Sequence, residues 1–230
     1  GARPTLVDCT VALAALGRRC RWEGALLALD SLQVGLLEPN AIVCNAGVSA
    51  CARGDRWRVA VALVEDMPGR AVQPDVISHS AVMTAYERSS HAREALQAFS
   101  AMRAEGLQPN AVSHAAAIIA CGRDGKWDSA LRFLSEMWRT RLEVDAMACN
   151  AAVGALKSNP QGLEASLLLL LGMKEHSLKP DVFYYNIAIT LCKEDSQWHL
   201  VLRLLDGMQS GGLEPDLLTW NSMLSACGVT

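Results

Sequence analysis

A spacing of 35 residues recurs along this 230-residue sequence and restricts the possible folds more than any other feature. Prolines, tryptophans and methionines all repeat at this interval or its multiples, with one extra residue in the second half. The repeated residues are Pro4, Pro39, Pro74, Pro109, Pro180 and Pro215; Trp22, Trp57, Trp127 and Trp198; and Met67, Met102, Met137, Met173 and Met208. Such a period is typical of solenoids and related arrays, in which each repeat is one supersecondary unit.

The spacing divides the chain into six whole repeats and two partial ones. We predict repeats 1 to 6 at 6–40, 41–75, 76–110, 111–145, 146–181 and 182–216, with 1–5 as the tail of a preceding repeat and 217–230 as the first helix of a seventh. Cys44 and Cys149 lie three whole periods apart, so the extra residue falls between Cys149 and Met173, and we expect it in the turn 158–162. Neither end resembles a polar capping repeat, so we expect a longer array.

Each repeat has the pattern of a helical hairpin. In 41–75, one apolar stretch covers 42–52, an Arg-Gly-Asp turn follows, and apolar residues then recur at three- and four-residue spacing over 56–67. A hairpin of this size buries its apolar face only by stacking on its neighbours. The sequence therefore predicts an all-α fold, an α–α superhelix of helix-turn-helix repeats.

Composition excludes several classes of protein. With 51% apolar residues and a net charge of −3, the chain is neither a disordered segment nor a polybasic protein that coats nucleic acid indiscriminately. The longest apolar run, 167–171, is far shorter than the roughly 20 residues that cross a bilayer, so we expect no membrane partner. No targeting leader is visible, so the sequence does not indicate a compartment.

The cysteines follow the repeat and not a metal-binding motif. None belongs to a C-x-x-C pair, and most stand at the fourth or the eleventh position of a repeat. These are Cys9, Cys44 and Cys149, and Cys51, Cys121, Cys192 and Cys227. We interpret them as core residues and expect no metal and no cofactor. The methionine and tryptophan columns are interpreted as second-helix core, with a stacking platform for nucleobases as the alternative for the tryptophans.

Catalytic motifs are missing from the sequence. There is no Gly-rich phosphate loop, no nucleophile elbow and no H-E-x-x-H, and two of the five histidines, His79 and His114, share one repeat position. We expect neither enzymatic activity nor a small-molecule substrate.

The junctions between repeats carry the most specific pattern. Five of the six read aliphatic-x-Pro-Asp/Asn before the next first helix, and the remaining one has Val144 in place of proline. On a 35-residue period this pattern resembles the pentatricopeptide repeat (PPR) family in its plain 35-residue P-type, over essentially the whole chain. A tetratricopeptide array would have a period of about 34 residues and a tryptophan in its first helix, whereas here the tryptophans fall in the second.

The resemblance implies a right-handed solenoid that binds single-stranded RNA, one base per repeat, and supports the processing, stability, editing or translation of mitochondrial or chloroplast RNA. The fifth and last residues of each repeat would read the base. These pairs are Thr10 with Asn40, Asn45 with Asp75, Ser80 with Asn110, Ala115 with Asp145, Asn150 with Asp181, and Asn186 with Asp216, and Asn221 opens a further pair. The family's preferences imply the tract A-U-A-N-U-U, with the fourth base unspecified because Ala115 has no polar group.

Two further positions acquire roles from the resemblance. The second residue of each repeat would pack on a base face, although plain core is the alternative; these residues are Val7, Ile42, Ile77, Val112, Met147, Phe183 and Leu218. The thirteenth residue would lie near the phosphates, with a solvated turn as the alternative; these residues are Arg18, Arg53, Arg88 and Arg123. Four phosphate contacts predict a salt slope of roughly −3.

One other class of function stays open. Fifth and last positions are polar in five of six repeats among apolar neighbours, which favours RNA binding. The net charge of −3, Ala115, and the replacement of the thirteenth-position arginine by Ser158 and Glu194 are compatible with a scaffold that holds a protein partner on the same surface.

Overall fold

The computed structural model describes residues 11–12, 15, 22–34, 40–156, 162–194 and 198–226, and for 30–34 and 193–194 only the backbone. Helices are the regular elements of these residues, which contain no strand. The chain divides into an N-terminal half, 1–120, and a C-terminal half, 121–230. Thr10, Val7, Arg18 and Ser158, and the side chain of Glu194, lie outside the described residues.

Two helices alternate in every described repeat. The first helices are α3 (Ala41–Arg53), α5 (Val76–Arg88), α7 (Ala111–Arg123), α9 (Ala146–Ala155), α11 (Val182–Glu194) and α13 (Leu217–Ala226). The second helices are α2 (Trp22–Val34), α4 (Trp57–Asp66), α6 (Ala92–Ala104), α8 (Trp127–Arg139), α10 (Gly162–Glu175) and α12 (Trp198–Ser210). A short 3₁₀ turn, η1 (Pro68–Arg70), follows α4. The hairpin predicted for 41–75 is confirmed by α3 and α4.

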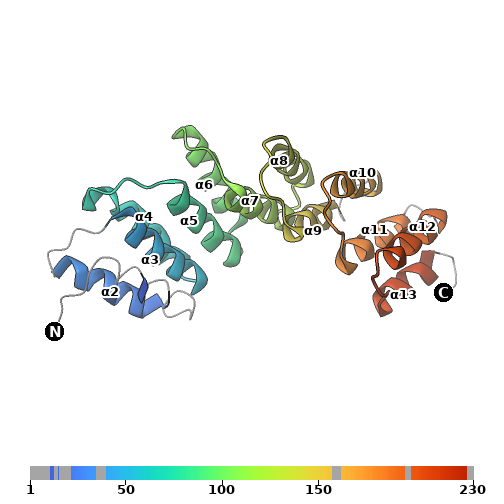
Figure 1. The fold of residues 1–230 in the computed structure, drawn as a ribbon, viewed down its shortest axis with the longest axis horizontal. Coiled ribbons are helices and arrows are strands. Elements are labelled where there is room, and N and C mark those ends of the chain that lie inside the picture. Colours follow the sequence, from blue (N-terminus) through green and yellow to red (C-terminus); the bar gives the residue numbers. More distant parts are fainter. Residues whose placement is uncertain are drawn as a thin grey trace. The chain divides into compact units, whose positions relative to one another are not determined.

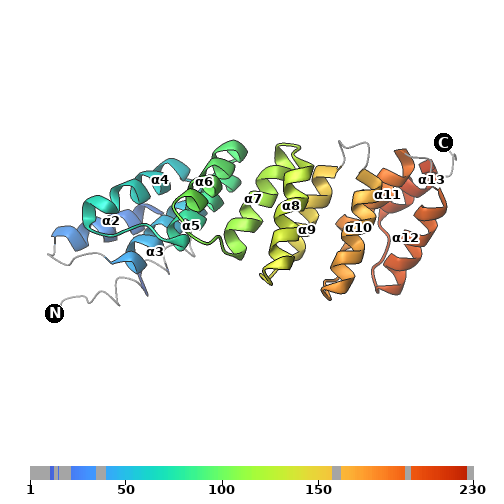
Figure 2. The same ribbon diagram turned by 90° about the horizontal axis from the view of Figure 1, so that it is seen from above.

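Within each half, first helices pack on first helices and second helices cover them. In the N-terminal half α3 lies beside α5, α4 packs on α3 and α6 packs on α5 (Figure 1). In the C-terminal half α11 contacts α9 and α13, while α10 and α12 contact α11, and Figure 2 shows this second arrangement from above. Stacking thus buries the apolar face that one hairpin leaves open.

Each of the two turns in a repeat contains one residue in the left-handed region. After the first helix this residue is Asp55, Ser90 or Gly125, with φ between 56° and 68°. After the second helix the next residue's amide donates to the carbonyl of the repeated methionine, for example Leu107 to Met102 at 3.1 Å. Gly106, which directly precedes Leu107, has φ 77° and takes this left-handed conformation without the steric penalty of a Cβ atom.

The repeated methionines form the centre of the packed layers. Met67, Met102, Met173 and Met208 are fully buried and Met137 is 1% exposed, so the core interpretation of this column is confirmed. The described cysteines also lie in the core. Burial raises the pKa of Cys51 and of Cys121 to about 11, which keeps both as neutral thiols at physiological pH.

The repeated tryptophans Trp22, Trp57 and Trp127 are half-buried, and Trp57 lies between two consecutive repeats. The Trp57 ring packs on His91 at 4.5 Å and on Tyr86 at 5.5 Å between centroids, both from the following repeat. Trp198 is more exposed, at 44%, because no second helix follows α13 among the described residues. Trp57 therefore packs at the contact between repeats 2 and 3.

The extra residue of repeat 5 is located by packing. Leu134 and Met137 in α8 and Leu170 and Met173 in α10 are buried 36 residues apart, and Ser166 is buried where α8 has Ala130. The shift is already present at Ser166, so the extra residue lies between Cys149 and Ser166. Most of the turn in which we expect it, 157–161, is outside the described residues. Among the residues that the structure describes, no helix is long and apolar enough to cross a bilayer.

Candidate nucleic-acid interface

The second residue of each described repeat is exposed, although the third residue, which follows it in the first helix, is buried. Exposure of these side chains ranges from 52% to 64%. They are Ile42, Ile77, Val112, Met147, Phe183 and Leu218. The alternative interpretation of these residues as plain core is wrong, because more than half of the surface of each is exposed to solvent. An apolar side chain held in solvent at one position of successive repeats is available to an apolar partner.

The last residue of each repeat caps the first helix of the next. Asp75 accepts hydrogen bonds from the amides of Ile77 and Ser78, both at 2.9 Å, and Asp145 accepts one from Ala148 at 2.8 Å. The same cap is made by Asn40, Asn110, Asp181 and Asp216. Aspartate and asparagine are favoured N-caps in any helix. Helix capping alone is therefore enough to explain the polar residues at the last position. A polar residue at the fifth position has no such capping role and is the more specific indication of binding.

Fifth and last residues do meet in the structure. The Asn45 side-chain nitrogen donates to both carboxylate oxygens of Asp75, at 3.0 and 3.2 Å, across 30 residues of sequence. Asn186 does the same with Asp216 at 3.3 and 3.1 Å. We call the fifth and last residues of one repeat, where they are in hydrogen-bond contact, a polar pair. Each of these two pairs places an amide and a carboxylate side by side at the start of a helix.

Two other repeats have polar pairs of different geometry. Asn150 donates to one oxygen of Asp181 at 2.7 Å. The Ser80 hydroxyl lies 3.1 Å from the Asn110 carbonyl oxygen but also 2.6 Å from the backbone oxygen of Val76. Because a hydroxyl has one hydrogen, Ser80 serves only one of these acceptors at a time.

For repeats 1, 4 and 7 the structure describes no complete pair. Ala115 offers no polar atom, and Asp145 is exposed and acts as a helix cap. Asn221 is exposed on α13. Asn40 caps α3, while its expected partner Thr10 lies outside the described residues.

Accessibility differs between the two members of a pair. Asn45, Ser80 and Asn186 are 4–6% exposed, whereas Asp75, Asn110 and Asp181 are half-buried and Asp216 is exposed. A ligand would therefore meet the last residue first and the fifth residue behind it. Each asparagine amide has two N–H groups, so one remains when the other donates to the carboxylate.

The aspartates of two pairs are held in the charged form. Partial burial acts to raise the pKa of Asp75, but hydrogen bonds from Ser78, Asn45 and the Ile77 amide outweigh it and lower the pKa. The backbone and hydroxyl of Thr219, with the Asn186 amide, lower the pKa of Asp216. At neutral pH both carboxylates are acceptors only.

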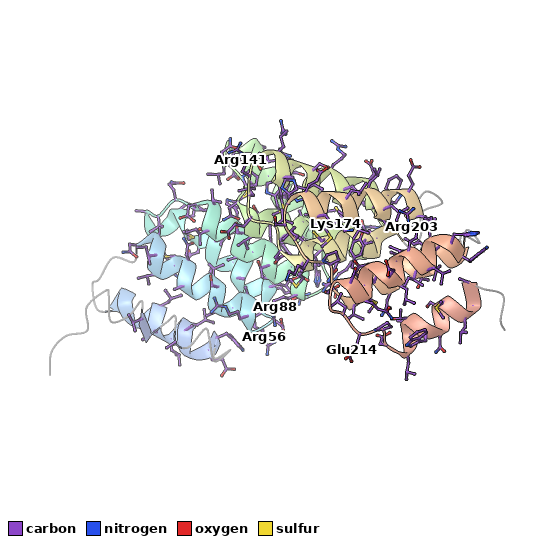
Figure 3. The ribbon with its side chains drawn as sticks, turned by 45° about the vertical axis from the view of Figure 1, so that its right-hand side comes forward. Arg56, Arg88, Arg141, Lys174, Arg203 and Glu214 are labelled. Atoms are coloured by element: carbon purple, nitrogen blue, oxygen red, sulfur yellow. The ribbon has the colours of Figure 1, made fainter. Side chains whose placement is uncertain are left out.

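The thirteenth-position arginines end the first helices. Arg53 and Arg123 are exposed. The Arg88 guanidinium donates to the Asp55 carboxylate at 2.9 Å, in the turn after α3, and Figure 3 shows Arg88 at the same end of these hairpins as Arg56. Arg88 thus forms an ion pair with an acidic residue of the preceding repeat. Among the described residues no cluster of three or more potential metal ligands occurs.

Comparison with known families identifies the architecture. A model described as "Pentatricopeptide repeat-containing protein" matches residues 42–169, more than half of the chain, and one described as "PPR repeat family" matches 164–228. The chain belongs to the pentatricopeptide repeat family. A comparison with curated proteins gives no match.

Solved pentatricopeptide repeat structures have the same fold. The maize protein PPR10 is 29% identical to this chain, with a TM-score of 0.61 over 97% of it and 32% of PPR10. PPR10 in complex with an 18-nt psaJ RNA element is 28% identical, with a TM-score of 0.60 over 98% of this chain and 36% of that one. The chain thus spans about a third of PPR10.

A more distant structure matches in fold alone. The PPR domain of Arabidopsis thaliana protein-only RNase P 1, in complex with tRNA, is 12% identical, with a TM-score of 0.50 over 94% of this chain and 95% of that one. These neighbours confirm the all-α superhelical class predicted from the pentatricopeptide repeat spacing.

Two features of the interface were not predicted from the sequence. One is the capping by the last residues, which an Asp or Asn directly before each helix start could have indicated. The other is a hydroxyl at the third position, Ser78 or Thr219, which contacts the fifth residue of the preceding repeat at 2.6 Å. This contact joins residues 33 apart, and no local pattern predicts it.

Proposed function

We propose that this chain binds single-stranded RNA through its pentatricopeptide repeats and reads one base per repeat, without chemistry of its own. The repeats are those at 6–40, 41–75, 76–110, 111–145, 146–181 and 182–216, with a partial repeat on either side. The observation that carries the proposal is the exposed apolar second residue that recurs in every described repeat, together with the polar pairs. The RNA complex of PPR10 supports the same class of ligand.

The chemistry of the Asn–Asp pairs suits uracil. Uracil presents a carbonyl oxygen beside an N–H, and the pair presents an N–H from the asparagine beside an acceptor-only carboxylate. A base without this donor and acceptor order would leave buried polar groups unpaired, at a cost of about 1–3 kcal/mol each. The exposed second residue, such as Ile77 at 56%, would cover the face of the base.

The proposed tract is A-U-A-N-U-U, read by repeats 1 to 6 in order. Base discrimination is absent at the fourth position because Ala115 contributes no donor or acceptor. Exposed arginines such as Arg53 and Arg123 would contact phosphates. Because the chain belongs to the pentatricopeptide repeat family, we propose that the protein acts in a mitochondrion or chloroplast, in the processing, stability, editing or translation of RNA.

A filter-binding titration against salt tests the proposal. The ligands are a single-stranded RNA that carries the tract, the same bases in scrambled order, and a duplex of the tract. We expect retention of the tract RNA, weaker retention of the other two, and an affinity that falls with salt. Equal retention of tract and scrambled RNA would remove base reading, and no retention of any RNA would favour a protein-binding scaffold instead.

A further inference from the structure

The three Asn–Asp pairs are identical in sequence but differ in what surrounds the asparagine. The difference lies at the third residue of the following repeat, which is buried in all three cases. Next to Asn45 and Asn186 it is a hydroxyl residue, Ser78 or Thr219. Next to Asn150 it is Tyr184.

The carboxylate fixes how each asparagine amide is turned. A carboxylate only accepts hydrogen bonds, so the amide nitrogen faces the aspartate. The Asn45 carbonyl oxygen then faces away from Asp75 and lies 2.6 Å from the Ser78 hydroxyl, which is 3.1 Å from an Asp75 oxygen, so the shorter contact to Asn45 takes the hydroxyl's one hydrogen. The Thr219 hydroxyl likewise lies 2.6 Å from the Asn186 carbonyl oxygen and 2.8 Å from an Asp216 oxygen, so its one hydrogen is closest to Asn186. In both pairs the amide is therefore held at both ends.

Tyr184 cannot serve Asn150 in this way. Its hydroxyl donates to the backbone oxygen of Ser166, on the α10 side. The Asn150 carbonyl oxygen is buried and has no hydrogen-bond partner among the described residues. Among the described residues, the Asn150 amide is thus held only by its contact with Asp181.

We propose that Ser78 and Thr219 are positioning residues that determine how strictly their repeats select uracil over cytosine. The inference rests on the proposed function. With its carbonyl occupied, Asn45 or Asn186 offers a base only an N–H, which suits the carbonyl oxygen of uracil and not the amino group of cytosine. The Asn150 carbonyl has no such partner in the described part of the chain, so this amide can rotate to accept from that amino group, at the loss of its contact with Asp181. Repeats 2 and 6 therefore reject cytosine, whereas repeat 5 tolerates it.

The chain supplies a matched control at the same helical position. Ser113 is buried at the third position of repeat 4, as Ser78 is in repeat 3. Its hydroxyl, however, donates to the backbone oxygen of Asn110 at 2.9 Å and not to the fifth residue Ser80. Ser113→Ala therefore removes an equivalent buried hydroxyl without touching any of the three Asn–Asp pairs.

Affinities of the wild type, Ser78→Ala, Thr219→Val and Ser113→Ala test the inference. The RNAs carry the tract with uracil or cytosine at base 2, 5 or 6, and the uracil-to-cytosine affinity ratio is measured for each base. In the wild type we expect larger ratios at bases 2 and 6 than at base 5. Ser78→Ala should lower the ratio roughly five- to tenfold at base 2 alone, Thr219→Val at base 6 alone, and Ser113→Ala at none.

Several outcomes would overturn the inference. Unchanged ratios in Ser78→Ala and Thr219→Val, with uracil still preferred at bases 2 and 6, contradict it while leaving the proposed function intact. An equal fall at all three bases means general loosening and also contradicts it. Thr219→Val preserves side-chain shape, so it decides the matter even where Ser78→Ala unfolds the chain. A wild type without any base preference removes the proposed function and this inference together.

Discussion

Replacement of Asp75 by alanine removes an interaction that replacement of Asp145 does not. Both aspartates cap a helix, α5 or α9. Only Asp75 also accepts from a fifth-position side chain, Asn45, at 3.0 and 3.2 Å, because the corresponding residue for Asp145 is Ala115. The two substitutions therefore separate the capping role of a last-position residue from its role in a polar pair.

The magnitudes follow from these contacts. Loss of an N-cap costs about 1 kcal/mol, and this is the whole expected effect of Asp145→Ala. Asp75→Ala also loses a hydrogen bond to a charged acceptor, worth about 1.5 kcal/mol at a half-buried site. We expect Asp75→Ala to reduce the free energy of unfolding by about 2.5 kcal/mol. The preference for uracil at base 2 should fall about tenfold, since ~1.4 kcal/mol corresponds to a factor of ten.

Denaturant unfolding and RNA competition measure these effects. Asp75→Asn is the control: an amide oxygen still caps α5, so the helix should keep most of its stability while the acceptor-only carboxylate is lost. Equal stability losses for Asp75→Ala and Asp145→Ala, with unchanged uracil preference at base 2, would refute the account of the pair.

The same variant predicts a pH dependence. The pKa of Asp75 is lowered in the folded chain from an ordinary value of 3.8. Its contribution to stability is therefore complete at neutral pH and is lost as the pH falls below about 4, through the folded pKa. The stability difference between the wild type and Asp75→Asn should shrink in acid. A difference that stays constant from neutral pH to pH 3 would contradict this.

Three further predictions concern packing, thiols and charge. Gly122→Ala should lower stability by about 1–3 kcal/mol in denaturant unfolding, since a Cβ would lie 2.7 Å from the Ala151 backbone oxygen. Gly154→Ala, where a Cβ would meet nothing within 4 Å, should gain about 0.5–1 kcal/mol, and equal effects would contradict the close approach of Gly122 to Ala151. Cys51 should react with a thiol reagent at pH 8 only when the chain opens, and rapid labelling of the folded protein would disprove its burial. Arg53→Gln should flatten the salt dependence of RNA affinity by about 0.7 in slope, and an unchanged slope would exclude a phosphate contact.

The fold could be predicted from the sequence because its information is periodic. Methionine at one position of each repeat indicated a buried column, and the Arg-Gly-Asp turn after α3 indicated a hairpin. Burial in the structure follows the same columns.

The candidate interface could be predicted only in part, because a column of residues carries no distances. The sequence placed Asn45 and Asp75 in register but could not show that they touch, nor that Ser78 completes the group. It also could not separate capping from binding at the last position, since both require the same residue types. At the second position, apolar residues suited either core or solvent, and only the 52–64% exposure decided between them.

Selection of bound RNA from a random single-stranded library tests the central claim most directly. For the wild-type chain we predict enrichment of A-U-A-N-U-U with no preference at the fourth base. The chain with Asn186→Thr, in which Asp216 is kept, should enrich the same tract except at the sixth base, where the family's preferences move uracil toward guanine. Enrichment of an identical tract by both chains, or of no tract by either, would contradict base reading by the polar pairs.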